Sequence, residues 1–271
     1  MITLHTVVDL RAGVHAWKHD GLRVGFVPTM GNLHAGHFSL VELAKRHADR
    51  VVASVFVNPT QFGPNEDFAR YPRTLDADGE GLGAHGCDAL FAPSVAGMYP
   101  DGADNAVQIR VPGITAILDG AHRPGHFDGV ATVVARLFNM VQPDVAVFGQ
   151  KDYQQLQVIR QMVRDLAFPI AIVAAPTARA DDGLALSSRN QYLSETERAL
   201  APEIHRTLLA MRDAVKGGEP LEAIEAVAST RLATAGFAVD YTAIHRADLG
   251  VPEPSQRAGL VALVAARLGA T

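Results

Sequence analysis

The hydrophobic positions of the chain change their spacing several times between residues 22 and 174. Four short apolar runs have the length of buried strands, at residues 22–27, 51–57, 145–148 and 170–174. Three segments with apolar residues at helical spacing lie between them, at residues 40–48, 130–141 and 156–166. Strands that alternate with helices in this way build a parallel sheet with helices on both faces. The pattern therefore predicts an α/β fold whose ligands bind beyond the carboxyl ends of the strands.

Two further regions depart from this alternation. Residues 61–111 contain many Pro, Gly and Asp, which predicts loops and short helices lying over the site. After about Pro176 the pattern changes again, and Ser194 and Glu197 have the spacing of a capping box. This box predicts a helix that runs to about Val215, followed by a second helix and a few strands. We therefore expect two domains, residues 1–176 and a smaller α+β domain of residues 177–271.

Composition narrows the class of protein. The chain has 271 residues, 48% of them hydrophobic, and a formal net charge of -5. A core of useful size is expected, and no basic patch points to a nucleic-acid partner. A single cysteine, Cys87, excludes an internal disulfide and suggests a reducing compartment. We see no signal peptide and no apolar run long enough to span a membrane, so we expect a cytoplasmic protein without membrane contact.

The strongest local signal is the run Pro-Thr-Met-Gly-Asn-Leu-His-Ala-Gly-His at residues 28–37. It follows a predicted strand and opens a helix, and His34 and His37 share one face of the first turn. Gly36 leaves room for a ligand, and the amino end of a helix favours phosphate. The alternatives are a capped helix start with two surface histidines, or a zinc site, for which we find no convincing third and fourth ligand.

A second signal is Asn-Pro-Thr-Gln-Phe-Gly at residues 58–63, at the end of the next predicted strand. The amides of Asn58 and Gln61 offer donors and acceptors without charge, which suits a substrate with hydroxyls and a carboxylate. An ordinary turn whose amide satisfies its own backbone is the alternative.

A third signal is Phe-Gly-Gln-Lys-Asp-Tyr-Gln-Gln at residues 148–155, again at a strand-to-helix turn. Lys151 can supply a compact positive charge to a phosphate. Asp152 can accept from ribose hydroxyls or cap the helix, and Gln155 lies one turn beyond Lys151. The alternative is a capped helix with solvated Lys and Asp side chains.

A fourth signal is Leu-Ser-Ser-Arg-Asn at residues 186–190, after the flexible-looking run Ala-Asp-Asp-Gly at residues 180–183. The hydroxyls of Ser187 and Ser188 with the guanidinium of Arg189 would make a phosphate clamp, and the preceding glycine suggests a segment that closes over ATP. A helix cap with a surface arginine is the alternative.

A weaker candidate precedes the long apolar helix. Arg123 and His126, in the run Arg-Pro-Gly-His-Phe-Asp-Gly, could reach the site, or could belong to a tight turn with an N-cap at Asp128. The other histidines show no comparable context, and we expect Trp17 and Cys87 to be packing residues.

In combination these runs resemble the pantothenate synthetase family. The run at 28–37 resembles its signature, and the other motifs follow in the family's order, including Tyr-Pro-Arg at residues 71–73. The resemblance is strong over residues 22–193 and weak afterwards. The His-x-Gly-His element alone would indicate only the wider nucleotidyltransferase group, which includes class I aminoacyl-tRNA synthetases.

The resemblance implies a Rossmann-like amino-terminal domain, a smaller carboxy-terminal lid, a homodimer and an Mg2+–ATP requirement. It implies that pantoate and β-alanine condense to pantothenate through a pantoyl adenylate, with release of AMP and pyrophosphate. The residues expected at ATP are Met30, Gly31, Asn32, Leu33, His34, Ala35, Gly36, His37, Gly149, Gln150, Lys151, Asp152, Ala178, Leu186, Ser187, Ser188 and Arg189. The residues expected at pantoate are Gln61, Gln155, Asn58 and Met30.

Catalysis is expected from side chains that neutralise phosphate charge, with His37 as the first choice for an acid or charge stabiliser. The others are His34, Lys151, Ser187, Ser188 and Arg189. Gln150 stands where the family usually has Glu, so no acidic role is expected there. Magnesium ligands are not assigned, although Asp76 and Asp78 are candidates, and the resemblance implies a closing segment beyond Thr271. Two rival functions remain, a nucleotidyltransferase acting on a phosphorylated acceptor and a non-enzymatic ATP-binding module.

Overall fold

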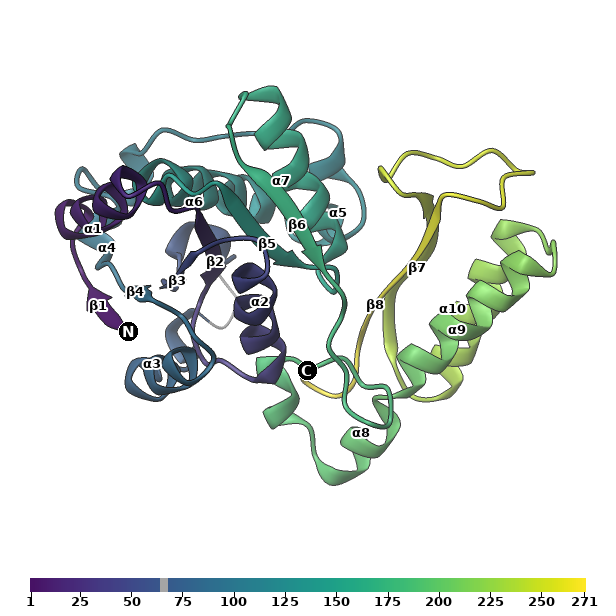
Figure 1. Ribbon diagram of the computed structural model, residues 1–271. Coiled ribbons are helices and arrows are strands. Elements are labelled where there is room, and N and C mark those ends of the chain that lie inside the picture. The colour runs from purple at the N-terminus through teal and green to yellow at the C-terminus, as the bar shows by residue number, and fades with distance from the viewer. Residues whose placement is uncertain (64–67) are drawn as a thin grey trace. The chain divides into compact units, whose positions relative to one another are not determined.

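The computed structural model describes residues 1–63 and 68–271. The chain divides into two units, Met1–Thr177 and Ala178–Thr271 (Figure 1). Within 61–111, residues 64–67 lie outside the described residues, so the expectation for that stretch concerns its remaining part.

The first unit is built on a parallel sheet of six strands in the order β1-β4-β3-β2-β5-β6. The strands are β1 Ile2–Leu4, β2 Val24–Thr29, β3 Arg50–Val55, β4 Ala89–Phe91, β5 Val145–Gly149 and β6 Ala171–Ala175. From β2 the chain continues to β3 on one side of the sheet, and from β5 it continues to β6 on the other side. The direction of the strand order therefore reverses between β2 and β5. Open parallel sheets bind ligands at such a reversal, so the carboxyl ends of β2 and β5 mark the expected site.

Helices cover both faces of this sheet, as the α/β prediction requires (Figure 1). They are α1 Val7–His19, α2 Ala35–Lys45, α3 Leu75–Ala84, α4 Val95–Met98, α5 Asp119–His122, α6 His126–Val141 and α7 Tyr153–Asp165, with short 3-10 turns η1 Pro59–Gln61, η2 Phe68–Arg70, η3 Ala103–Asn105 and η4 Ile114–Ala116. Apolar residues of α1, α6 and α7 form one core with strand residues such as Phe26. Residues of α2 and α3 form a second core with neighbours such as Val27, which points to the opposite face.

The four predicted strands and three predicted helices of this unit are confirmed, with small shifts at their ends. The strand predicted at residues 22–27 extends to Thr29, so Pro28 lies inside β2 opposite Ser54. The pairing of β2 with β5 covers Gly25 and Phe26, so Pro28 stands beyond that ladder, where a missing N–H is tolerated.

The prediction of loops and short helices for 61–111 was wrong in part. The described residues there include α3 and the strand β4, which pairs with both β1 and β3. The strand spans Ala89–Phe91 and is too short to produce a periodic signal of its own.

The second unit combines helices with an antiparallel pair of strands. Its elements are η5 Ser188–Tyr192, α8 Glu195–Leu200, α9 Glu203–Lys216, α10 Leu221–Thr234, β7 Ala238–Arg246 and β8 Leu260–Arg267. The capping box of Ser194 and Glu197 is confirmed at the start of α8. The expected continuous helix to Val215 was wrong, because the chain is interrupted at Pro202, which cannot continue the hydrogen-bond ladder of α8. Among the described residues no helix has the length and hydrophobicity needed to cross a membrane.

Candidate active site

The loop between β2 and α2 is held by two histidines that cap the helix reciprocally. The Gly36 N–H donates to Nδ1 of His34 at 3.1 Å, and the His34 N–H donates to Nδ1 of His37 at 3.4 Å. The two ring centroids are 4.1 Å apart. Since each Nδ1 accepts a hydrogen bond, the neutral rings carry their proton on Nε2. The spacing of three residues therefore gives two imidazoles with Nε2–H donors side by side.

A buried carboxylate holds the preceding part of the same loop. Asp78 on α3 is 3% exposed and accepts the N–H groups of Asn32 at 3.0 Å and Leu33 at 2.8 Å, as well as the Thr74 hydroxyl at 3.1 Å. Asn32 has a φ of 52°, and Gly31 before it has a φ of 87°. Such left-handed backbone is costly for a non-glycine residue, and the Asp78 clamp offsets that cost.

This arrangement changes how the loop can bind an anion. The amino end of a helix favours phosphate partly through its N–H groups, but many of those in this loop are already bonded within the protein. The N–H groups with internal acceptors belong to Gly31, Asn32, Leu33, His34 and Gly36. The imidazole Nε2–H groups of the loop lie beside the positive end of the α2 dipole, where an anion is favoured.

Lys151 and Asp152 lie in the same electrostatic neighbourhood as the two histidines. Burial lowers the pKa of His37 to about 4. The neighbouring His34 and Lys151 also lower this pKa, whereas Asp152 raises it. The pKa of His34 is also lowered, mainly by burial and then by Lys151. Both imidazoles are therefore neutral at pH 7 without ligand. Strand β5 lies next to β2, which brings the first and third sequence signals together.

Asp152 occupies the N-cap position of α7 but makes no side-chain cap hydrogen bond. Its carboxylate lies 3.3 Å from Nζ of Lys151, and the side chains of Lys151 and Asp152 are 40% and 63% exposed. The capping alternative for Asp152 is therefore wrong, and its carboxylate remains accessible to a ligand.

The second signal forms a buried network around Asn58, which is 1% exposed. Its Nδ2 donates to Oε1 of Gln61 and to the Gly129 carbonyl, both at 3.2 Å. Its Oδ1 accepts from the Tyr99 hydroxyl at 2.8 Å and the Thr60 hydroxyl at 3.1 Å. The carboxamide is thus fully used, which revises the expectation that Asn58 itself contacts the substrate.

Gln61 lies at the end of η1 with its Nε2 2.9 Å from Sδ of Met30, so two residues expected at the substrate are in contact. Its backbone carbonyl accepts from Nδ1 of His126 at 2.8 Å. Nε2 of His126 in turn accepts from Arg123 at 3.0 Å. The structure therefore brings both weak candidates to Gln61. The alternative of an N-cap at Asp128 was wrong, because α6 begins at His126 after Gly125.

The two glutamines that end the third signal have different surroundings. Gln154 is 3% exposed and binds three backbone groups, the Asp119 N–H and the carbonyls of Ile114 and Ile117. It fixes the segment before α6, a function that the sequence did not reveal. Gln155 is half-buried on the first turn of α7, where its amide remains available for a ligand.

In the second unit, the residues expected at the nucleotide lie on one hairpin. The Leu186 N–H donates to the Ala178 carbonyl at 2.9 Å, so these two expected residues are neighbours. The Ser187 hydroxyl accepts a hydrogen bond from the Arg189 N–H at 3.3 Å and caps η5, as the alternative of a helix cap predicted. A cap of this kind leaves the hydroxyl able to donate to a ligand.

A cavity of about 430 Å³ lies at the carboxyl ends of β2, β3 and β4. Met30 and Gly31 belong to its wall, together with Val57, Arg73 and Ser94 among others. Gln61 and Gln155 are not among its lining residues.

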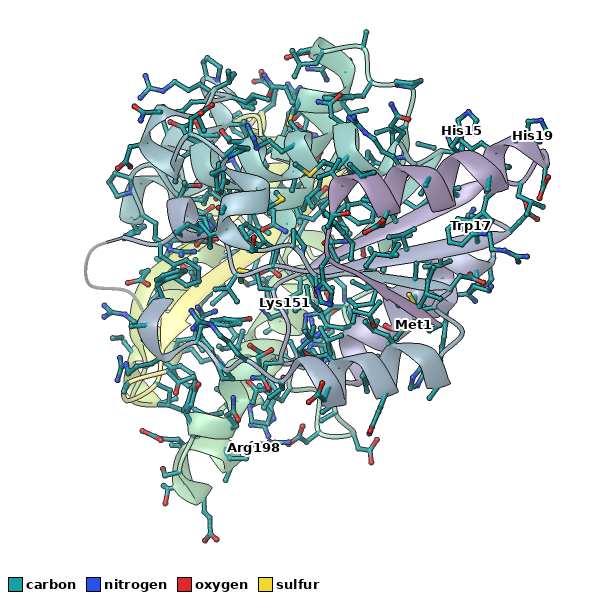
Figure 2. All side chains as sticks on the ribbon, turned by 90° about the vertical axis from the view of Figure 1, so that its left-hand side faces the viewer. Met1, His15, Trp17, His19, Lys151 and Arg198 are labelled. Carbon is teal, nitrogen blue, oxygen red and sulfur yellow. The ribbon has the colours of Figure 1, made fainter. Side chains whose placement is uncertain are left out.

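Other conspicuous side chains lie elsewhere. His15 and His19 on α1 are exposed and far from Lys151, and Trp17 packs against the core (Figure 2). Cys87 is 4% exposed, and burial raises its pKa to about 11. The expectation that Trp17 and Cys87 are packing residues is confirmed.

Comparisons with known proteins identify the family of this chain. The model of the pantoate-beta-alanine ligase family matches residues 2–271. The chain belongs to the pantoate-beta-alanine ligase family. It is 61% identical over 99% of its length to the pantothenate synthetase of Xanthomonas euvesicatoria, covering 96% of that protein. The pantothenate synthetase of Stenotrophomonas maltophilia is 60% identical with the same coverage.

Solved structures of the pantoate-beta-alanine ligase family share this fold. The pantothenate synthetase of Thermus thermophilus has a TM-score of 0.91 at 51% identity, covering 99% of this chain and 95% of that one. The Francisella tularensis ligase, a complex with beta-gamma ATP and beta-alanine, has a TM-score of 0.79 at 34% identity, covering 99% and 97%. The predicted α/β class is thereby confirmed, and the chain belongs to a family of ligases.

Proposed function

We propose that the chain joins pantoate to β-alanine in an ATP-dependent reaction, through a pantoyl adenylate, and releases AMP and pyrophosphate. The observation that supports this most is the meeting of His34, His37 and Lys151 where β2 and β5 end. These are groups for a polyphosphate, and the amide of Gln61 beside Met30 suits an organic acid. The Francisella relative was solved with beta-gamma ATP and beta-alanine, which agrees with this assignment.

In the first step, a carboxylate oxygen of pantoate attacks the α-phosphorus of ATP, and the bond to pyrophosphate breaks. Charge grows on the leaving oxygens, and preorganised donors lower the barrier by meeting it. The Nε2–H groups of His34 and His37 supply two such donors, and Lys151 supplies a positive charge. We assign His37 the leading role, since its burial makes each interaction stronger.

In the second step, the amine of β-alanine attacks the acyl carbon of the adenylate, AMP leaves, and the amine loses a proton. Orientation of the two reactants is the main requirement. Gln61 and Gln155 would hold the acid, and Asp152 would accept from the ribose. Residues 1–176 would thus bind ATP and pantoate, whereas residues 177–271 would act as a lid that excludes water.

The lid would contribute Ser187, Ser188 and Arg189 to the phosphates, with Ala178 and Leu186 near the adenine. Ser187 caps η5 and the Leu186 backbone is tied to Ala178, so this hairpin offers its groups in a defined local geometry. We include Gly149 and Gln150 in the nucleotide site because Gly149 ends β5 and Gln150 follows it. Ala35 follows His34 in the phosphate-binding loop.

We also propose that ATP acts as its Mg2+ complex. No cluster of three or more His, Cys, Asp or Glu suited to a metal occurs in the part of the chain that the structure describes. Asp78 is engaged with backbone N–H groups, so we no longer favour it as a ligand. Phosphate oxygens and water would fill most of the coordination sphere of the magnesium ion. The bound ion would neutralise phosphate charge. We further propose that the protein is a homodimer and works in the cytoplasm.

One experiment tests this function against its rivals. Pyrophosphate release from ATP is measured with pantoate, with and without β-alanine, and the product is analysed by mass spectrometry. The proposal requires pyrophosphate release that depends on pantoate, and pantothenate formation that depends on β-alanine. A product that retains the nucleotidyl group would indicate a nucleotidyltransferase, and binding without pyrophosphate release would indicate a binding module.

A further inference from the structure

The carboxamide of Gln61 can face a substrate in two ways, and the two ways recognise opposite chemistry. With its nitrogen outward it donates to carboxylate or hydroxyl oxygens, whereas with its oxygen outward it accepts from ammonium or N–H groups. What fixes the orientation of Gln61 therefore decides which acids the site accepts.

The orientation starts at two backbone groups that each have one hydrogen-bonding function. The Gly129 carbonyl can only accept, and it lies 3.2 Å from one terminal atom of Asn58. The Thr60 N–H can only donate, and it lies 3.4 Å from the other. The amide nitrogen of Asn58 must therefore face Gly129 and its oxygen must face Thr60.

Asn58 then transfers this orientation to Gln61. Its second N–H points to Oε1 of Gln61 at 3.2 Å, so the Gln61 oxygen is turned inward. Nε2 of Gln61 is turned the other way, beside Sδ of Met30 at 2.9 Å. A thioether is a weak acceptor, so a carboxylate or hydroxyl oxygen would compete with it readily.

Tyr99 holds Asn58 from the protein interior. The phenol is 2% exposed, and its hydroxyl must donate to Oδ1 of Asn58, which can only accept, at 2.8 Å. The ring is itself fixed, with the Arg136 guanidinium 5.1 Å from its centroid and Phe56 packed against it. Gly129 allows η1 to approach α6 this closely, because a Cβ there would collide with the Thr60 carbonyl.

We propose that Tyr99 is a positioning residue that, together with Gly129 and Thr60, acts through Asn58 to keep the nitrogen of Gln61 turned toward the acid substrate. The inference rests on the proposed function, in which Gln61 binds pantoate. It adds a specificity rule, namely that the site selects acids presenting an oxygen acceptor to Gln61. It also explains why Asn58 is buried beside the site instead of lining it.

A double-mutant cycle tests the proposal in the full-length protein. Tyr99→Phe removes the hydroxyl and keeps the ring, and we expect the KM for pantoate to rise about three- to tenfold, the range of a neutral hydrogen bond. The KM for ATP should stay unchanged. Added to Gln61→Ala, Tyr99→Phe should have no further effect on pantoate, since its effect passes through Gln61.

Ser54→Ala is the matched control. Ser54 lies on β3 just before Asn58, and its hydroxyl is fully buried without a hydrogen-bond partner in the described structure. Its removal should leave both KM values unchanged. An unchanged pantoate KM in Tyr99→Phe would overturn the proposal, as would an equal rise in the Gln61→Ala background, which would indicate a merely structural effect.

Gln61→Glu gives a second test that does not depend on how well Tyr99→Phe folds. The variant keeps the size of the side chain and an acceptor for Asn58, but its outer atom no longer donates. We expect pantoate affinity to fall more than tenfold with ATP affinity retained, and wild-type pantoate affinity would refute the polarity argument. If the wild-type protein itself formed no pantothenate, the proposed function would fail, and this inference with it.

Discussion

The reciprocal cap of His34 and His37 predicts that the two nitrogens of His37 can be separated by mutation. Nδ1 accepts the His34 N–H at 3.4 Å, whereas Nε2–H is free to serve a phosphate in the proposed mechanism. Asparagine places an amide atom near the position of Nδ1, and glutamine places one near Nε2. His37→Asn should therefore keep the cap and lose the donor, and His37→Gln should do the reverse.

The expected sizes follow from the two interactions. A hydrogen bond to a charged group contributes about 1.5–3 kcal/mol, so His37→Asn should slow adenylate formation roughly 10- to 150-fold. Loss of a helix cap costs about 1 kcal/mol, which in a protein of this size lowers the Tm by roughly 2–4 °C. His37→Gln should show that drop in Tm while retaining most of its adenylation rate.

Single-turnover formation of the adenylate and thermal unfolding are measured on the same preparations. His19→Asn is the control, because His19 is 81% exposed at the side chain and lies on α1, away from the site. It should change neither quantity. The reasoning would be refuted if His37→Asn formed adenylate at the wild-type rate, or if both variants lost the same activity and the same stability.

Three further predictions follow from single side chains. Asp78→Asn should lower the free energy of unfolding by about 1–3 kcal/mol and raise the KM for ATP, because one loop N–H loses its acceptor, whereas Glu80→Gln on the exposed face of α3 should do neither. The pKa of His37 is lowered from 6.5 to about 4, so the unfolded chain binds more protons than the folded one between these pH values, and the free energy of unfolding should fall as pH falls from 6.5 to 4. Urea unfolding at several pH values should show a smaller fall for His37→Asn than for the wild-type protein. Burial raises the pKa of Cys87 to about 11, so a thiol reagent should label the native protein far more slowly than the urea-unfolded one, and equal rates would contradict the burial.

Much of the architecture could be predicted from local patterns. The apolar runs at 22–27, 51–57, 145–148 and 170–174 led to strands of the sheet, and the motifs at their ends led to the carboxyl edge where the candidate site lies. The short strands β1 and β4 escaped prediction because three residues carry too little periodicity. Prolines misled in both units, since Pro28 lies within a strand and Pro202 interrupts a helix that was expected to continue.

The sequence by itself determined the chemistry of the candidate site. A spacing of three residues places His34 and His37 on one helical turn, and this arrangement depends only on the short stretch of chain between them. Only the tertiary structure decided how those groups are held and charged. Asp78 reaches the loop from 46 residues away, and Tyr99 reaches Asn58 from 41 residues away. Such pairs depend on which strands lie next to each other, and the order of strands in a sheet is set by packing of the whole unit, which no local run of residues encodes.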